Sequence, residues 1–388
     1  MQEYNWKKER EKYRPDFMKQ PEPVKEPAAP PPPPPAVKRS YAGWVFAALV
    51  LAVVGFMVVA FALNVNKGKE SNATTQGSSA SSKQSGDSAT MLAQAAERSK
   101  NAVGLVILNV ELKNGKKIQE PIGTAWAFAP NKFATNAHVA NGISEKCDEI
   151  IKALVVQSLK ARAEKAGFKS DVEAYLNSLD DKKSDEIIAE CMKEVNSLVR
   201  GFSASILING THHKSFAITH VQIHRDFGVT NTSFDPDVAA LTIDGTSDAV
   251  FKIADDQTLE TLKSGDNVAF LGFPMEYLDN DNVNLDNPVA SMQSGIVVAV
   301  SDFDMKDAGP AGNYLIRHNL PSTGGASGSP IFNKNGEVVA LLYAGNTIGQ
   351  VKNGRVTRAP SAAQINFGVR SDLIQGLGPA VDIQKLLP

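Results

Sequence analysis

Short apolar runs separated by polar turns make up most of the chain beyond residue 95. They are rich in β-branched and aromatic residues, as strands are. The runs are 102–112, 123–128, 216–223, 238–243, 267–273, 295–300, 314–319, 330–332, 338–343 and 365–369. Asn114-Gly115 and Asn335-Gly336 are among the turn signals between them. About ten strands at this spacing predict an all-β domain, a Greek-key sandwich or a pair of barrels, rather than a parallel α/β sheet.

The strand pattern is interrupted between residues 144 and 200. In this block apolar residues recur at helical spacing, first at Ile151 and Leu154 and later at Cys191 and Val195. The segment 170–173 also has the capping-box pattern that starts many helices. We therefore expect two or three helices inserted into the β domain over residues 144–200.

A different pattern appears near the N-terminus, where residues 42–65 form 24 consecutive positions without a charge, nearly all of them apolar. A helix of this length crosses about 30 Å of hydrocarbon at about 1.5 Å per residue. A secretory signal peptide has a shorter apolar region nearer the N-terminus, and no clear cleavage pattern ends this run. We expect a transmembrane helix over 42–65, with a cleaved signal peptide as the alternative.

The charges around this segment predict its orientation. Lys38 and Arg39 lie immediately before it, whereas Lys67 and Lys69 are the near basic residues after it. The positive-inside tendency leaves the N-terminus in the cytoplasm and carries the rest of the chain across the membrane. The expected location is the inner membrane of a cell, single-pass, with the C-terminal domain in the periplasm or another extracytoplasmic space.

The remaining composition divides the chain into four parts. Residues 1–41 are polar and Pro-rich, which predicts a disordered cytoplasmic tail. Residues 66–90 are mostly Ser, Gly and Thr, which predicts a flexible linker. Residues 91–388 are long enough for one large domain with the insertion 144–200. The net charge of −2, without a long run of one sign, argues against nucleic acid as a partner.

Cys147 and Cys191 are the two cysteines of the chain and lie near the two ends of the helical block. Outside the cytoplasm, a disulfide closing this loop would restrict the unfolded insertion by about 3 to 4 kcal/mol. Two unrelated buried thiols are the alternative, and we favour the disulfide because of the predicted side of the membrane. A metal site is not expected from two cysteines in a block without histidine.

Candidate chemistry centres on Ser327, which lies between glycines in "GGASGSP". A serine hydroxyl is a weak nucleophile and needs a base, a group that orients the base, and donors for the oxyanion. Of six histidines, His138 ends a strand-like run in "FATNAHVANG". His220 and His224 point to one face of a strand about 13 Å apart, so we favour surface histidines over metal ligands there.

The orienting carboxylate is sought in "SFDPDVAALTIDG". Asp237 immediately precedes the apolar run "VAALTI", a place from which a partly buried carboxylate can orient an imidazole. Asp235 precedes Pro236 and is typical of turn chemistry. By itself, a serine between glycines indicates only a turn.

Three motifs together resemble a known family. "TAWAFAPNKFATNAHV", "DPDVAALTI" and "GGASGSPIFN" occur in the order His, Asp, Ser that characterises the chymotrypsin class. The chain from about residue 95 to 380 resembles the trypsin-like serine proteases, and among them the HtrA and glutamyl-endopeptidase-like branches. The resemblance implies two six-stranded Greek-key β-barrels, here interrupted by the helical insertion.

The resemblance also implies roles for these residues. His138 would be the general base for Ser327, and Asp237 would hold the tautomer of His138. Backbone N–H groups of Gly325 and Ser327 would form the oxyanion hole. No cofactor and no metal is implied, and the substrate would be a polypeptide.

The pocket for the substrate side chain is expected on two segments. These are the residues before the nucleophile, Ser322, Thr323 and Gly324, and those at the end of the following strand, Tyr343, Ala344 and Gly345. Tyr343 would limit the depth of the pocket and favour small or medium apolar side chains. The strand "VVALLYAG" lacks the histidine with which the glutamyl endopeptidases read acidic side chains, so glutamate specificity is not supported.

The chain also departs from the HtrA pattern, because about 19 residues follow Val369, too few for a PDZ domain. We therefore expect a membrane-anchored, extracytoplasmic serine endopeptidase without PDZ domains, acting in envelope protein quality control or in signalling. The alternative is a catalytically silent pseudoprotease that binds partners through the helical insertion. The resemblance leaves open a homo-oligomer or a regulatory partner on that insertion.

Overall fold

The computed structural model describes residues 82–212, 214–230, 232–275, 285–345, 347–352, 355–360 and 365–388. The expected cytoplasmic tail, the expected transmembrane helix over 42–65 and most of the expected linker lie outside these residues. In the described part, contacts divide the chain into one unit that includes residues 82–147 and 201–388 and a second unit that includes residues 148–200. No helix among the described residues is long and apolar enough to cross a membrane.

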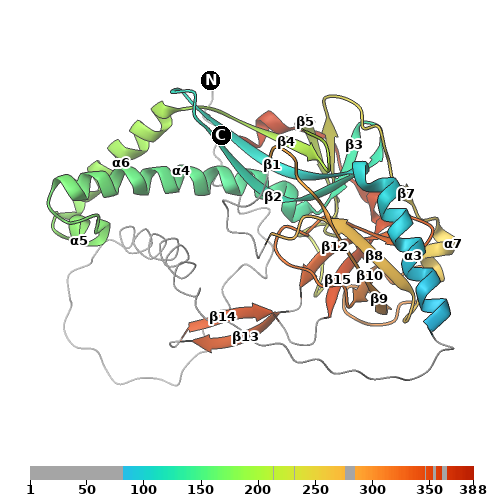
Figure 1. Cartoon of the computed structure of the whole chain (residues 1–388). Helices are drawn as coiled ribbons and strands as arrows, with labels where there is room; N and C mark the ends of the chain where they lie inside the picture. The colour runs from blue at the N-terminus through green and yellow to red at the C-terminus, as the bar shows by residue number, and fades with distance from the viewer. Residues whose placement is uncertain are drawn as a thin grey trace, which may run out of the picture. The chain divides into compact units, whose positions relative to one another are not determined.

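The first sheet closes into a six-stranded antiparallel barrel (Figure 1). Its strands are β1 Val103–Leu112, β2 Lys117–Ala129, β3 Lys132–Thr135, β4 Val199–Ile208, β5 Ser215–Ile223 and β6 Ala239–Ile243. They follow the order β5-β4-β1-β2-β3-β6, and pairing of β5 with β6 closes the ring. A short strand, β16 Val381–Asp382, adds to β5 from outside.

The second sheet closes in the same way. Its strands are β8 Asn267–Gly272, β9 Ser291–Ser301, β10 Leu315–His318, β11 Pro330–Asn333, β12 Glu337–Gly345 and β15 Asn366–Arg370. They follow the order β11-β8-β9-β10-β15-β12, and pairing of β11 with β12 closes the ring. The strand β7 Lys252–Ile253 adds to β12 in parallel. A hairpin, β13 Thr347–Lys352 and β14 Arg355–Pro360, leads from β12 towards β15. The two six-stranded barrels expected from the sequence are confirmed.

Each barrel has a core of inward-facing residues from its strands. In the first barrel, Trp126 and Phe133 are fully buried, and all but one of the first eight residues of β1 are buried. In the second, Phe270, Ile331 and Leu342 belong to one buried cluster. Burial of large side chains on both sheets is the main free-energy gain of such a fold.

Several helices precede or follow the strands of the barrels. The helix α3 Ser82–Ser99 precedes β1 and contacts β8 and β9. It takes in residues 82–90, the end of the stretch expected to be a flexible linker. Leu92, Ala95 and Ala96 are buried on one face of α3, so tertiary packing stabilises the second half of the helix, which continues from the Ser-rich first half. The remaining short helices of the unit are η3 Lys100–Ala102, α7 Asp256–Glu260, η4 Ser371–Gly376 and η5 Ile383–Lys385.

The insertion consists of three helices, as expected, but its first helix begins earlier than residue 144. The helices are α4 Ala137–Lys165, α5 Val172–Asn177 and α6 Asp181–Leu198. The side chains of Asp171 and Asp180 cap α5 and α6. Within residues 148–200, Val155, Leu159, Cys191 and Val195 form a small apolar core.

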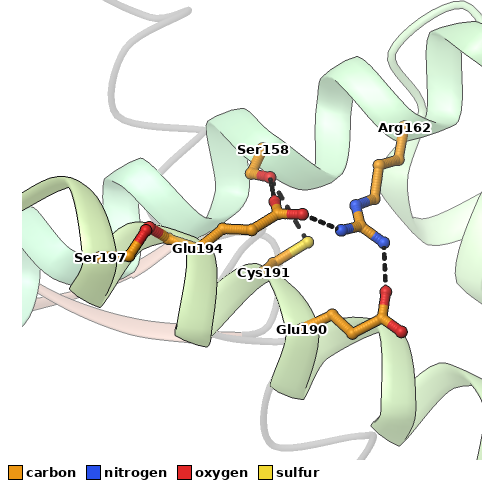
Figure 2. Close-up of polar contacts among 6 residues, drawn as sticks. All are labelled: Ser158, Arg162, Glu190, Cys191, Glu194 and Ser197. Atoms are coloured by element: carbon orange, nitrogen blue, oxygen red, sulfur yellow. Dashed lines mark hydrogen bonds and ion pairs between the residues drawn. The ribbon is translucent and has the colours of Figure 1, made fainter.

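A polar network joins α4 to α6 beside this core (Figure 2). Arg162 on α4 donates to Glu190 at 2.8 Å and to Glu194. The Ser158 hydroxyl donates to Glu194 at 3.1 Å and lies 3.5 Å from the Cys191 sulfur. The hydrogen bond to Glu190 raises the pKa of Arg162, so this guanidinium stays charged. Glu190 and Glu194 are largely exposed, so we expect these pairs to orient the helices more than to stabilise them.

The disulfide expected between Cys147 and Cys191 does not form, because both thiols are free and buried. Cys147 donates to the carbonyl of Ile143 one turn earlier in α4. Cys191 lies against Ser158, which is eleven residues after Cys147 on the same helix, a rise of about 16 Å. A disulfide needs Cα atoms within about 7 Å. Each cysteine is instead used as a small apolar residue.

Candidate active site

His138 and Asp237 form one half of the candidate site. His138 lies in the first turn of α4, directly after β3, and Asp237 lies two residues before β6. His138 Nδ1 is 2.5 Å from Asp237 Oδ2, and the backbone N–H of His138 donates to Oδ1 at 2.8 Å. The Asp237 side chain is fully buried, whereas that of His138 is 42% exposed. The Asp237 carboxylate is therefore shielded from solvent, while the imidazole of His138 remains accessible.

Neighbouring strands explain why two residues so far apart in sequence meet. Strands β3 and β6 pair antiparallel, with Thr135 opposite Ala239. Asn136 is fully buried between the two segments, and its Nδ2 donates to the backbone oxygen of Asp237 at 2.8 Å. Asn136 therefore ties the segment of Asp237 to the segment that carries His138. Sequence reasoning missed it, although it stands in the motif "TNAH".

The electrostatics of the pair suit a base. Partial burial of the ring lowers the pKa of His138, but the charge of Asp237 and the hydrogen bond to it raise the pKa more, so the net shift is upward. A raised pKa makes the imidazole a stronger proton acceptor and stabilises the imidazolium that forms when it takes a proton.

Ser327 follows a tight turn. Ala326 N–H donates to Thr323 O at 3.1 Å, and Gly325, the third residue of this turn, has φ +87°. A positive φ at that position is the mark of a type II turn. A Cβ at Gly325 would also lie 2.5 Å from Phe273 O. Glycine is needed here for both reasons.

The turn leaves two backbone donors unused. In the described residues, neither Gly325 N–H nor Ser327 N–H donates to any acceptor, while Ala326 N–H and Gly328 N–H both do. Gly324 O accepts from Met275 N–H at 2.7 Å. Because a trans peptide points its C=O and N–H in opposite directions, Gly325 N–H points away from Met275. Two unpaired N–H groups beside a serine are what an oxyanion hole requires.

Thr124 of β2 holds this loop against the first barrel. Its Oγ1 donates to Gly325 O at 2.9 Å and accepts from Phe273 N–H at 3.1 Å. Its backbone N–H donates to Ser327 O at 2.9 Å. Thr124 is fully buried. One residue thus fixes the carbonyls of Gly325 and Ser327, and the sequence analysis assigned it no role although it begins the motif "TAWAFAPNKFATNAHV".

Ser327 and Val139, the residue after His138, both lie close to Gly123. A Cβ at Gly123 would lie 2.9 Å from the methyl groups of Val139 and 3.3 Å from Ser327 O. The residue after His138 and the residue expected to be the nucleophile therefore both approach Gly123 on the side to which a Cβ would point. In the described part of the chain the Ser327 hydroxyl makes no hydrogen bond, so the contact between Ser327 and His138 is not closed in this structure.

The residues expected to line the substrate pocket lie in the loop before Ser327 and at the end of β12. Ser322 lies beside Gly345, with its hydroxyl 3.9 Å from where a Cβ of Gly345 would be. Thr323 and Gly324 belong to the turn before Ser327, and the Thr323 hydroxyl is buried without a partner among the described residues. The side chain of Ala344 lies outside the described residues. Ser322 and Gly345 thus lie close to each other.

Tyr343, expected to limit the depth of the pocket, lies near the ring of His138. Its ring centroid is 6.4 Å from that of His138 and 6.1 Å from that of Phe234. Burial raises the pKa of its phenol, and the charges of Asp237 and Asp235 add to the shift. Tyr343 therefore lies beside the His138–Asp237 pair as a neutral side chain. Asp235 accepts from the hydroxyl of Thr230, in keeping with a turn residue.

A metal centre was not expected, and the described residues contain no group of three or more His, Cys, Asp or Glu that could hold one. His220 bonds to the hydroxyl of its neighbour Thr219 at 3.2 Å, and His224 is buried beside Asp226.

Two closed six-stranded barrels, with a histidine bonded to a buried aspartate on one and a serine after a glycine turn on the other, define the chymotrypsin-like class of β-barrel proteins. Residues 123–341, more than half of the chain, match the trypsin-like peptidase domain. The chain belongs to the trypsin-like peptidase family. No curated protein sequence matches it.

Solved structures similar to the chain include three proteases. The HtrA-type protease AlgW with decapeptide is 13% identical with a TM-score of 0.42, over 73% of this chain and 65% of that one. The Rv3671c protease from M. tuberculosis in its active form is 15% identical with a TM-score of 0.37, over 73% and 81%. Its inactive form is 14% identical with a TM-score of 0.36, over 73% and 89%. The chain thus spans less than two thirds of AlgW, and similarities this low carry no conclusion about substrate or regulation.

Proposed function

We propose that the protein is a serine endopeptidase with His138, Asp237 and Ser327 as its catalytic triad. The observation that carries this proposal is the buried Asp237 carboxylate, which bonds to both the ring and the backbone of His138. A histidine held in this way has one tautomer and one orientation, as a general base needs. Membership of the trypsin-like peptidase family supports the same reading.

In the proposed reaction, His138 Nε2 takes the proton of Ser327 Oγ as the oxygen attacks the substrate carbonyl. The oxyanion that forms accepts hydrogen bonds from Gly325 N–H and Ser327 N–H. The imidazolium then gives its proton to the leaving amine, and an acyl-enzyme remains on Ser327. Water, activated by the same imidazole, hydrolyses the ester. The reaction needs no cofactor.

A serine-reactive fluorophosphonate probe tests this proposal on the full-length protein in detergent. We expect wild type to be labelled and Ser327→Ala to remain unlabelled. Ser329→Ala is the matched control: Ser329 is two residues away and fully buried, and its hydroxyl has no partner among the described residues, so this variant should label like wild type. Labelling that persists in Ser327→Ala would contradict the assignment of the nucleophile.

Absence of labelling in wild type under every condition would favour the alternative, a pseudoprotease that binds partners through the helical insertion. Labelling only in the presence of a partner would mean that the endopeptidase needs activation. Such activation would have to form the hydrogen bond between the Ser327 hydroxyl and His138, which is absent among the described residues.

We further propose that residues 42–65 anchor the protein in the inner membrane, with the peptidase domain on the extracytoplasmic side. The proposal rests on the 24 uncharged residues and on Lys38 and Arg39 before them. Fusion of an alkaline phosphatase reporter after residue 388 should give an active reporter, because that enzyme matures only outside the cytoplasm. An inactive phosphatase fusion would contradict this topology if a fluorescent protein that folds only in the cytoplasm is bright when fused at the same position.

The biological setting we propose is envelope protein quality control or signalling. It rests on the resemblance to HtrA proteases, a fold-level analogy. Accumulation of misfolded envelope proteins in a Ser327→Ala strain, relative to wild type, would support quality control.

A further inference from the structure

A cavity of about 360 Å³ lies at the second barrel, bordered by the end of α7, the loop 302–314 between β9 and β10, and strands β9, β10 and β15. Its volume is within the range of small-molecule sites. The lining residues belong to the described part of the chain and include no member of the proposed triad and none of the residues expected in the substrate pocket. The cavity is therefore a feature apart from the candidate active site.

The floor of this cavity is apolar. Leu259, Leu262 and Ile316 are buried and belong to the hydrophobic core of the second barrel, and Val300 packs against that core. Core side chains are held in place by their neighbours, so the floor keeps its shape without a ligand. These four side chains offer van der Waals contact to an apolar group and no hydrogen bond.

The mouth of the cavity is acidic, since the exposed charged residues that line it are Glu260 and Asp307. Asp307 Oδ1 accepts from Asn313 Nδ2 at 3.0 Å and from Gly309 N–H at 2.9 Å, and these bonds lower the pKa of Asp307. The carboxylate is therefore ionised at neutral pH. Glu260 makes no hydrogen bond and no ion pair among the residues that the structure describes. Two carboxylates with acceptor oxygens to spare thus lie at the edge of an apolar cavity.

Arg370 also lines the cavity but does not neutralise its mouth. It is 5% exposed, and its Nε and Nη2 donate to Asp372 at 2.9 and 2.6 Å. Burial lowers the pKa of Arg370, the bond to and the charge of Asp372 raise this pKa more, and Glu260 contributes least to the rise. Nη1 donates to Pro310 O at 2.7 Å, which fixes the loop that carries Asp307. The guanidinium is thus paired with Asp372, and the two charges at the mouth remain.

We propose that this cavity binds a primary ammonium joined to a short apolar group, with the apolar group on the floor and the ammonium at the acidic mouth of Glu260 and Asp307. An ammonium has three N–H donors, and its hydrogen bonds to carboxylates are charge-assisted. Lys306, the neighbour of Asp307, pairs with Asp304 at 3.7 Å and does not fill this role. A free alkylamine and the N-terminal residue of a peptide both carry this chemistry. The inference goes beyond the proposed peptidase function and does not rest on it.

Isothermal titration of the full-length protein in a non-ionic detergent tests this proposal, with protein-free detergent as the blank. The probes are hexylamine, hexanol and hexanoate, which share an alkyl chain and differ in charge. Hexylamine should bind roughly tenfold more tightly than hexanol, and hexanoate should bind most weakly because both carboxylates repel it. The preference for hexylamine over hexanol should shrink as salt is added, since the mouth of the cavity is exposed.

The peptide amide Leu-Gly-Gly and its N-acetyl form distinguish the two sources of the ammonium. Binding of the free peptide and not of the acetylated one makes N-terminal residues ligands of the cavity. Binding of hexylamine alone limits the site to free amines. Failure of both hexylamine and the free peptide to bind overturns the inference.

Variants locate the bound ligand in the cavity. Glu260→Gln and Asp307→Asn should each weaken binding of the ammonium ligand roughly three- to fivefold, leave binding of hexanol unchanged, and together remove the preference for the ammonium. Asp256→Asn is the matched control, because Asp256 is an exposed acid in α7 that does not line the cavity.

Equal affinity of the ammonium ligand for wild type and the double variant would overturn the inference, since the ligand would then bind elsewhere. Should Asp307→Asn fail to fold, Glu260→Gln decides alone, because Glu260 is exposed and its side chain makes no hydrogen bond in the described part of the chain.

Discussion

Asp237 holds His138 at two points, with Oδ2 2.5 Å from ring Nδ1 and Oδ1 accepting from the backbone N–H at 2.8 Å. Both oxygens of the carboxylate are thus acceptors. The Asp237→Asn variant keeps the shape but has one acceptor and one NH2 group, so one of the two contacts must place a donor against a donor or change the tautomer of His138. We expect kcat to fall roughly 10⁴-fold with little change in KM.

The control for this prediction is Asp235→Asn. Asp235 is also a buried carboxylate, two residues earlier, but it bonds to the Thr230 hydroxyl and not to the imidazole. The Asp235→Asn substitution should lower kcat less than tenfold. Equal effects of the two substitutions on kcat would show that Asp237 has no special relation to the base.

The raised pKa of His138 gives a pH prediction. The base works only when neutral, so the labelling rate of Ser327 should rise with pH and fall as pH drops through the pKa of His138. Because the net effect of Asp237 is to raise that pKa, the midpoint should lie above the ordinary value of 6.5. In Asp237→Asn the midpoint should move to lower pH, since the charge that raised it is gone. A midpoint that stays in place would mean that another group titrates.

Much of the fold follows from the alternation of short apolar runs, because each barrel buries one face of every strand. Strand β4 was not expected, since the first half of Val199–Ile208 is only partly buried and it follows directly on a helix. The start of α4 at Ala137 was also missed. The motif around His138 reads as the end of a strand, and the helix continues from it without a break into the insertion.

The triad candidates were found because each stands in a local motif. Thr124 and Asn136 lie in the same motif as His138 but were not singled out, because their roles depend on contacts between distant segments. Thr124 and Gly325, for example, are 201 residues apart. The disulfide was wrongly expected for a related reason, since spacing in sequence says nothing about which turns of α4 face α6. Residues that act through packing become visible only once the sheets are closed.

Thr124 is a residue that we expect to position the loop of Gly325 and Ser327 without touching the substrate, and its variants test that role. In Thr124→Val the size is kept, but Gly325 O loses its donor and Phe273 N–H loses its acceptor. We expect kcat to fall roughly ten- to hundredfold and the free energy of unfolding to fall by about 1–3 kcal/mol. KM should change little, because Thr124 does not line the pocket.

Thr124→Ser distinguishes positioning from a general loss of packing. It restores the hydroxyl and removes a methyl group, so activity should return to near the wild-type level even if some stability is lost. If serine and valine lower kcat equally, then packing of the methyl group and not the hydrogen bonds would govern the loop.

His318 on β10 predicts acid sensitivity of the second barrel. It is fully buried, and the backbone of Phe367 is the one neighbour that favours its charged form. Burial lowers the pKa of His318 from 6.5 to about 4. The folded state therefore binds this proton more weakly than the unfolded state does. The contribution of the neutral ring is fully present above pH 6.5 and is lost as pH falls towards 4, by about 3 kcal/mol in all.

Urea unfolding at pH 7.5 and pH 4.5 measures this contribution in wild type, His318→Phe and His220→Phe. The His318→Phe variant should lose less stability than wild type between the two pH values, by about 2.5 kcal/mol, because phenylalanine keeps a ring in the core and takes up no proton. His220→Phe removes an exposed histidine and should follow wild type. A difference between the two pH values that is the same in all three proteins would mean that the His318 ring binds its proton equally in the folded and unfolded chains.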